Sequence, residues 1–313
     1  MNTFWNKLPF GKNRKNKLRA KWTAGNIIFI GVAILLAVYA LFLLILLCWG
    51  FLTSMKDFYR DFARGNVAGF PNPWTFQNYA TALESFFVDI TVSSGTYRIN
   101  LVGLFEYTIL YAVGCAFFAT LSPCIVAYTV ARFGRKFKFL NVYTSIVIVC
   151  LVLPIVGNTP SEMRIARALG LYDQIWGMWI LKAHFLCMYY LVFFGTYRAM
   201  PDGFAEAAKI DGAGNCRIFF QIYFPLTLNL FTTVMLIQVI ALWNDYQTPL
   251  LYLDSWPTLA YWLFMYNQQT GDDVSVMTLR ATGIMLLLLP LLIVFLFFSK
   301  RIMGNLSLGG LKE

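Results

Sequence analysis

The chain has 313 residues, of which 59% are hydrophobic and only 13% charged, and its formal net charge is +10. Soluble globular proteins average about 45–50% apolar and about 25% charged residues, so this composition excludes an ordinary soluble domain and predicts a membrane protein. The positive charge could indicate nucleic-acid binding. However, the basic residues lie beside apolar runs rather than along one polar face, so membrane topology explains the charge better and no nucleic acid is expected.

Six apolar stretches are each long enough to cross a bilayer, since about 20 helical residues cover its apolar core of about 30 Å. Five of them contain no Asp, Glu, Lys, Arg or His, and the fourth contains only Lys182 and His184 from this group. They extend over residues 26–55, 107–131, 139–161, 174–197, 218–244 and 281–299. The sequence therefore predicts an all-α integral membrane protein with six transmembrane helices.

The predicted parts of the chain follow one another in a simple order. Residues 1–25 form a basic leader, 26–100 hold the first transmembrane helix and a long outer loop, 101–303 form a five-helix core, and 304–313 form a tail. The first apolar run is too long for a secretory signal and is predicted to be retained. Lys and Arg number 17 on the side of both termini and 7 on the other. Because cytoplasmic flanks retain these residues, both termini are predicted to be cytoplasmic.

The long outer loop is rich in aromatic residues, and its segment 71–79 predicts an extended piece followed by a helix. Thr75 is the candidate N-cap of that helix. Two interpretations of the aromatic residues stay open: they anchor the loop at the level of the lipid headgroups, or they contact a ligand.

Polar residues in the fourth and fifth spans form a candidate substrate path. Lys182 lies within the fourth span, where an ionisable group faces a cavity or a partner, although it could equally snorkel to the outer interface. His184, close by, is more often a hydrogen-bonded packing residue. The fifth span ends with Trp243, Asn244 and Asp245. Aromatic faces, amides and carboxylates suit sugar binding, but an interfacial aromatic belt has a similar composition.

A short helix is predicted between the fourth and fifth spans, at about residues 202–214. Pro201 and Asp202 would open it, and Gly212 or Gly214 would close it. Its side chains are mostly small, which lets another backbone approach closely, and Glu206 supplies one charge that a basic partner could pair. An ordinary cytosolic turn is the alternative interpretation.

Several common motifs are missing from the sequence. There is no Gly-x-x-x-x-Gly-Lys-Ser/Thr phosphate loop, so the chain is not expected to bind nucleotide by that device. A single histidine excludes a His-His metal motif, and no Cys-x-x-Cys pair indicates zinc. We therefore expect a subunit that is not an enzyme and that holds no metal or cofactor of its own.

The residues around the short helix carry a family resemblance. Glu206-Ala207-Ala208, Gly212, Ile222 and Pro225 match, at the full spacing, the Glu-Ala-Ala, Gly, Ile-x-Leu-Pro signature of importer-type ABC transporter permeases. Phe224 stands where the family usually has Leu. The chain resembles most the carbohydrate-uptake, maltose-type subfamily, in the stretches 71–79, 210–213, 243–245 and 306–312.

The resemblance implies a fold, a membrane and a set of partners. The fold is that of a type I ABC importer permease in the inner or plasma membrane of a bacterial cell. The partners are a second permease subunit in a heterodimer, two ATPase subunits that hold ATP and Mg, an extracytoplasmic solute-binding protein and a carbohydrate, here predicted to be an oligosaccharide. The residues implied to couple to the ATPase are Glu206, Ala207, Ala208, Asp211 and Gly212.

A second hypothesis is a secondary transporter or channel for a small polar solute that works without partners. Such proteins commonly carry charged groups or broken helices at the bilayer midplane. The middle parts of the predicted spans are nearly free of acidic residues, which favours the ABC permease.

Overall fold

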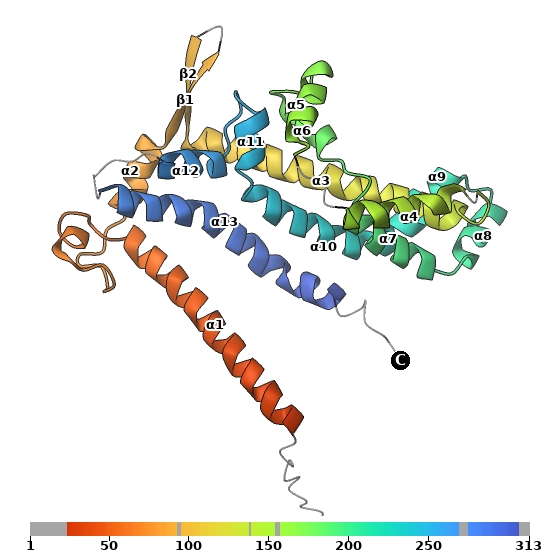
Figure 1. The fold of residues 1–313 in the computed structure, drawn as a ribbon, viewed down its shortest axis with the longest axis horizontal. Coiled ribbons are helices and arrows are strands. Elements are labelled where there is room, and N and C mark those ends of the chain that lie inside the picture. The colour runs from red at the N-terminus through yellow and green to blue at the C-terminus, as the bar shows by residue number, and fades with distance from the viewer. Residues whose placement is uncertain (1–23, 93–94, 138, 154–156, 269–274, 307–313) are drawn as a thin grey trace, which may run out of the picture. The chain divides into compact units, whose positions relative to one another are not determined.

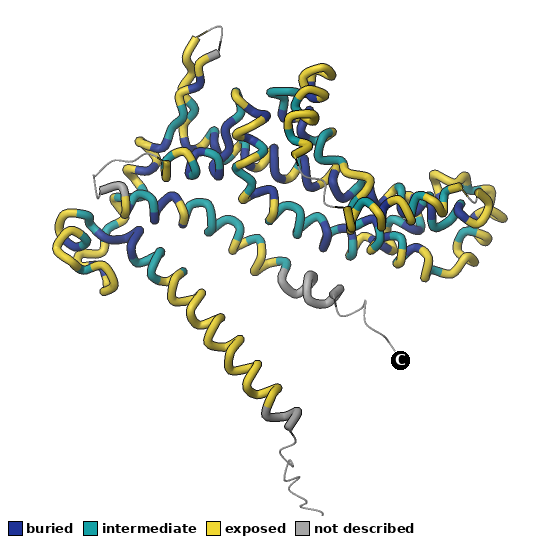
Figure 2. The backbone as a smooth tube through the Cα atoms, viewed as in Figure 1, coloured by how far each residue is buried: buried dark blue, intermediate teal, exposed yellow. Residues whose placement is uncertain are grey.

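The computed structural model describes residues 24–92, 95–137, 139–153, 157–268 and 275–306, and the described chain is largely helical (Figure 1). It divides into two compact units, residues 1–49 and 50–313. Most of α1 (Ala24–Ser54) belongs to the first unit, and every residue from Ile28 to Leu46 is exposed (Figure 2). Because this helix is apolar around its whole circumference, it requires lipid or another protein around it.

The second unit contains the remaining helices. An irregular helical segment, Phe219–Tyr223, joins α9 to α10, so that residues 215–243 form one helical run. The helices are α2 (Gln77–Ser85), α3 (Leu101–Phe133), α4 (Phe139–Val152), α5 (Thr159–Ala168), α6 (Ile175–Leu181), α7 (Met188–Ala199), α8 (Gly203–Ile210), α9 (Asn215–Ile218), α10 (Phe224–Trp243), α11 (Gln247–Tyr252), α12 (Leu259–Gln268) and α13 (Ser275–Leu306).

Helix α3 is the centre of the second unit and packs against α6, α7 and α10. Small residues let these helices approach closely: Ala112, Cys115 and Ala116 in its middle turns are fully buried. Towards its C-terminal end, a cluster of aromatic side chains joins it to α7 and to the irregular segment Phe219–Tyr223 that precedes α10. Ring centroids in this cluster lie 5.5 Å apart for Tyr128 and Tyr197, and 5.3 Å apart for Tyr128 and Tyr223.

Among the described residues, four helices are long and apolar enough to cross a membrane: Ile28–Ser54, Leu101–Phe133, Asn215–Trp243 and Met277–Phe298. They correspond to the predicted first, second, fifth and sixth spans. The third predicted span differs, because α4 has only 14 residues and a separate helix, α5, follows it. Pro154 comes two residues after the end of α4, and a proline disfavours helical conformation in the residue before it.

The fourth predicted span is broken rather than continuous. Its first part is α6, its second part is α7, and residues 182–187 between them are not helical. The break contains the two ionisable residues of this span, whose side chains line polar cavities described below. One carbonyl freed by the break, that of Phe185, accepts a hydrogen bond from the hydroxyl of Tyr143 (2.8 Å), as backbone groups at membrane depth require.

The connection between α1 and α3 combines predicted and unexpected structure. As expected from its sequence, the extended piece around Pro71 leads into α2. The N-cap residue of α2 is Phe76 rather than the predicted Thr75, although the Thr75 hydroxyl still accepts a hydrogen bond from the backbone N–H of Gln77 at the start of the helix (3.1 Å). The sequence did not predict the antiparallel hairpin of β1 (Phe87–Val92) and β2 (Gly95–Asn100). The prediction of an all-α fold is therefore wrong in this segment.

An ion pair links the two strands of this hairpin. Arg98 on β2 donates two hydrogen bonds to Asp89 on β1, at 2.8 and 3.1 Å. These bonds hold the pKa of the Asp89 carboxyl below its usual value. Most of the predicted basic leader, residues 1–23, and the tail residues 307–313 lie outside the described residues.

Candidate functional site

The predicted short helix is present as α8, and its start and end follow the sequence signals. Asp202 is its N-cap residue, directly after Pro201. At the other end, the backbone N–H of Gly212 bonds the carbonyl of Lys209 (3.0 Å) and that of Ala213 bonds Ala208 (2.9 Å), which is the pattern of a Schellman cap. Gly212 has φ +76°, a left-handed conformation that favours glycine, so this residue closes the helix.

The residues of the predicted coupling set divide between two sides of α8. Ala208 is buried in the cluster of Tyr128, Tyr197 and Tyr223, whereas the other four, Glu206, Ala207, Asp211 and Gly212, are exposed. The buried alanine lets the helix pack closely on the transmembrane helices. The exposed residues leave a surface to which another protein could bind.

Ile210 belongs to the same exposed surface, although the sequence analysis did not select it. Its side chain is 88% exposed, which is unusual for a large apolar residue. Helical spacing could have identified it, since Glu206 and Ile210 are four residues apart and therefore lie on one face. We define the coupling surface as Glu206, Ala207, Ile210, Asp211 and Gly212.

Two arginines at the C-terminal end of α3, Arg132 in its last turn and Arg135 just beyond it, hold the start of α8, and we call this pair the clamp. Both carboxylate oxygens of Asp202 are paired, one with Arg132 and the other with Arg135 (2.6 Å). Arg132 also donates to the carbonyl of Met200 (3.1 Å), and its guanidinium lies 4.3 Å from the ring centroid of Tyr223. These contacts tie the end of a transmembrane helix to α8, so movement of one is expected to move the other.

The two arginines of the clamp should contribute unequally. The side chain of Arg132 is 10% exposed, whereas that of Arg135 is 79% exposed and its ion pair is screened by water. We expect Arg132→Gln to lower the free energy of unfolding by about 1–2 kcal/mol, and Arg135→Gln by about 0.5 kcal/mol or less. Thermal unfolding of the two purified variants in detergent measures the difference, and equal losses would contradict the clamp as described.

The break between α6 and α7 adjoins two cavities, of about 540 and 380 Å³, whose linings combine polar and apolar side chains. Both are lined by Lys182, His184 and Gln247, and the larger one is also lined by Asn244 and Asp245. The structure therefore brings together three members of the candidate substrate path from two segments far apart in the sequence.

A network of hydrogen bonds surrounds the Asp245 carboxylate. The Thr248 side chain donates to it at 2.6 Å and the Tyr111 hydroxyl at 2.8 Å. The ammonium of Lys182 lies 3.5 Å from the same carboxylate and donates to the Thr248 hydroxyl (2.8 Å). The charges of Lys182 and Asp245 thus compensate one another inside the fold.

Trp243, the fourth member of the candidate substrate path, does not line either cavity. It is 8% exposed, and its indole N–H donates to the carbonyl of Leu287 on α13 (2.9 Å). Its position supports a packing role between α10 and α13. Sequence could not separate Trp243 from Asn244, because the rotation of α10 is set by its neighbours.

In the described part of the chain, no group of three or more His, Cys, Asp or Glu residues is arranged to hold a metal ion. The site offers hydrogen-bonding side chains along two cavities and an exposed surface at α8.

Several known proteins are similar to this chain in sequence or in fold. The melibiose/raffinose/stachyose import permease protein MelC of Bacillus subtilis is 25% identical over 264 residues, covering 83% of this chain and 88% of that protein. The diacetylchitobiose uptake system permease protein NgcG of Streptomyces coelicolor is 25% identical over 280 residues, covering 88% and 86%. The crystal structure of a bacterial ABC transporter involved in the import of the acidic polysaccharide alginate has the same fold, with TM-score 0.67 and 23% identity over 89% of this chain and 98% of that one.

A family match covers the site itself. Residues 124–307, more than half of the chain, match the family described as binding-protein-dependent transport system inner membrane component. This match includes α8, the broken helix and the lining residues of both cavities except Ala119, and it confirms the resemblance drawn from the signature around Glu206 and Gly212. The chain is therefore a multi-pass membrane protein that belongs to the family of inner-membrane components of binding-protein-dependent transport systems.

Proposed function

We propose that this chain is a transmembrane permease subunit of an ATP-driven importer that moves a carbohydrate, specifically an oligosaccharide, into the cell. The observation that carries the proposal is the coupling surface on α8, which is exposed while the helix itself is fixed by Ala208 and by the clamp at Asp202. The names of MelC and NgcG, which refer to sugar import and uptake, support a carbohydrate as the cargo.

The importer would require partners, because the sequence contains no phosphate loop. In this proposal two ATPase subunits hold ATP and Mg, a second permease subunit completes the membrane channel, and an extracytoplasmic solute-binding protein delivers the sugar. The role of this chain is mechanical. Closure of the ATPases would push on the coupling surface, and the clamp would transmit that movement from α8 to α3.

The proposed orientation places both termini and α8 in the cytoplasm, where the ATPases work. The excess of Lys and Arg on this side of the predicted topology supports it. The cavities beside the broken helix would then be presented to the sugar within the membrane.

The larger cavity suits an uncharged sugar. Its polar side chains include the amides of Gln238, Asn244 and Gln247, which can both donate to and accept from hydroxyl groups. Its ammonium group, on Lys182, is already matched by the carboxylate of Asp245. Tyr246 also lines the cavity, and its ring is stacked on Phe264 with 4.3 Å between centroids, which holds the aromatic face in place.

Variants of two neighbouring residues can distinguish a role in sugar contact from a role in packing. Asn244→Ala should raise the KM for transport about tenfold with little change in stability, because it removes a hydrogen-bonding group from the cavity wall. Trp243→Phe should lower the free energy of unfolding by about 1 kcal/mol, through loss of the bond to Leu287, and should leave KM unchanged. Uptake kinetics and thermal unfolding of both variants test this assignment. An effect of Trp243→Phe on KM alone would contradict it.

The alternative function is a secondary transporter or channel that acts without an ATPase. One observation favours it: the helix broken at Lys182 and His184 beside polar cavities resembles the broken helices at the binding sites of secondary transporters. The family match and the exposed coupling surface favour the importer.

Affinity purification of the chain from its native membrane in mild detergent, with mass spectrometry of the proteins that accompany it, tests the proposed assembly. We expect an ATPase with a phosphate loop, a second permease and a solute-binding protein. Recovery of the chain alone, together with solute transport in liposomes that lack ATP, would favour the alternative.

A further inference from the structure

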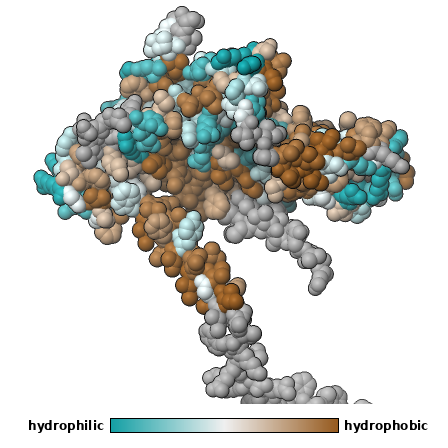
Figure 3. Space-filling view, viewed as in Figure 1, coloured by the Kyte–Doolittle hydropathy of each residue, from teal (hydrophilic) through white to brown (hydrophobic). Residues whose placement is uncertain are grey.

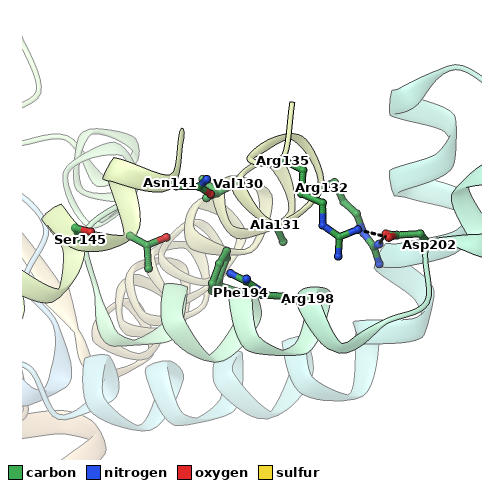
Figure 4. A pocket seen from close by; sticks show the side chains of 10 residues that line it. Val130, Ala131, Arg132, Arg135, Asn141, Ser145, Phe194, Arg198 and Asp202 are labelled. Atoms are coloured by element: carbon green, nitrogen blue, oxygen red, sulfur yellow. Dashed lines mark hydrogen bonds and ion pairs between the residues drawn. The ribbon is translucent and has the colours of Figure 1, made fainter. Parts of the chain in front are cut away.

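A third cavity lies next to the clamp and shares no lining residue with the two cavities at the broken helix. Its volume is about 310 Å³, and its wall is formed by the end of α3, by α4 and by α7 (Figure 4). Its polar lining consists mainly of basic, amide and hydroxyl side chains: Arg132, Arg135, Asn141, Thr144, Ser145 and Arg198.

The charges around this cavity do not balance. Three guanidinium groups line it, but the only carboxylate in its lining is that of Asp202. Each oxygen of that carboxylate is already occupied by one arginine of the clamp. Arg198 has no carboxylate within ion-pair distance in the described part of the chain; its guanidinium lies 5.7 Å from the ring centroid of Phe194. The cavity therefore offers positive charge to an anion.

A buried donor in the cavity lining also lacks an acceptor. The side chain of Arg132 is only 10% exposed, and its Nε atom is buried. This Nε has no hydrogen-bond partner among the described residues. A buried N–H group without an acceptor is costly, and native proteins usually supply one from a side chain, water or a ligand. The guanidinium of Arg132 therefore adds to the positive charge at the cavity wall without a full set of acceptors.

The surroundings of the cavity are those of a membrane interface. It lies where α3 and α7 end and α4 begins, and α4 exposes the apolar side chains of Phe139, Val142 and Ile146 beside it. Figure 3 shows apolar surface over this part of the unit. Basic pockets between transmembrane helices that adjoin apolar surface suit the headgroups of anionic lipids, whose acyl chains cover the helix face.

We propose that this cavity is a phosphate-binding site, filled by the phosphate of an anionic membrane phospholipid. Arg198 donates to phosphate oxygens, the positive charge of Arg132 adds attraction from the cavity wall, the hydroxyl of Ser145 is a further donor, and the acyl chains lie along α4. Guanidinium groups match phosphate because their N–H groups form paired, charge-assisted bonds. This site shares no residue with the proposed sugar path, so an experiment that disproves one of the two sites does not disprove the other.

Native mass spectrometry of the full chain, purified with the subunits that accompany it, measures the binding. Phosphatidylglycerol, phosphatidylcholine and inorganic phosphate are added separately. We expect phosphatidylglycerol to bind more tightly than phosphatidylcholine. Arg198→Gln should weaken its apparent affinity about tenfold, because a charge-assisted donor is lost. Lys136→Gln is the matched control, since Lys136 is an exposed cation near the end of α3 that does not line the cavity.

The arms of this experiment distinguish the sources of the phosphate. Selective loss of phosphatidylglycerol from Arg198→Gln supports the lipid. Binding of inorganic phosphate that depends on Arg198, without selective lipid binding, would keep the phosphate site but overturn lipid as its source. Equal binding of each ligand by wild type, Arg198→Gln and Lys136→Gln would overturn the site. Ser145→Ala, a small change at an exposed residue, repeats the test if Arg198→Gln does not fold, with loss of affinity expected and unchanged affinity contradicting the site.

Discussion

Glu206→Lys is expected to leave the chain inserted in the membrane and to abolish its association with the ATPase subunits. Glu206 is exposed on α8, so its charge is available to a partner, and the family resemblance implies a basic residue in the docking cleft. Reversal of the charge would place two positive groups in one interface. Such a change costs about 2–5 kcal/mol of binding free energy, which is enough to lose the complex at ordinary concentrations. Co-purification of the ATPase with the variant measures the effect.

Glu84→Lys serves as the matched control for this charge reversal. Glu84 is exposed on α2, in the segment between α1 and α3, and is far from α8 in the sequence. The Glu84→Lys variant should retain both its association with the ATPase and its transport activity. Normal ATPase binding and normal transport by Glu206→Lys would disprove the role of the coupling surface.

Gly212→Val is expected to disorganise the end of α8 and to impair coupling nearly as strongly. Gly212 has φ +76°, and a Cβ at this position would meet no atom within 4 Å. The cost is therefore conformational rather than a clash. A left-handed conformation costs an ordinary residue about 1–2 kcal/mol, and a β-branched residue tolerates it still less. ATPase co-purification and transport in the variant measure the loss.

Gly214→Ala tests whether the conformation, and not merely the loss of a glycine, causes this effect. Gly214 has an ordinary φ of −68° and open space around its Cβ position, so alanine should be accepted with near-normal transport. Gly212→Asn should retain part of the activity, because asparagine tolerates the left-handed region. Equal behaviour of Gly212→Val and Gly214→Ala would show that the cap does not matter.

The elements that follow from local rules could be predicted from the sequence. The long helix α3 and the helical run 215–243 that includes α10 follow from apolar runs that lack charge. Helix α3 extends its predicted run, 107–131, by a few residues at each end, and the run 215–243 nearly coincides with the predicted 218–244. The cap at Gly212 follows from the need for a residue that adopts positive φ. The exposed coupling surface follows from helical spacing once α8 is known, even though Ile210 was not selected.

Features that depend on tertiary contacts could not be predicted. The break at Lys182 is stabilised by Thr248 and by a hydroxyl from α4, both distant in the sequence. The hairpin of β1 and β2 lies within a loop that the sequence analysis defined only by the spans on either side of it. Trp243 packs against α13 and Asn244 lines a cavity, and this difference depends on the rotation of α10 relative to α13.

Uptake of a labelled oligosaccharide into proteoliposomes is the most direct test of the proposed function. The vesicles contain this chain with the permease and ATPase that co-purify with it, the solute-binding protein is added outside, and ATP with Mg is enclosed or omitted. The importer predicts uptake that requires enclosed ATP, the solute-binding protein and an intact Glu206. Equal uptake without ATP, by liposomes that contain this chain alone, would contradict it.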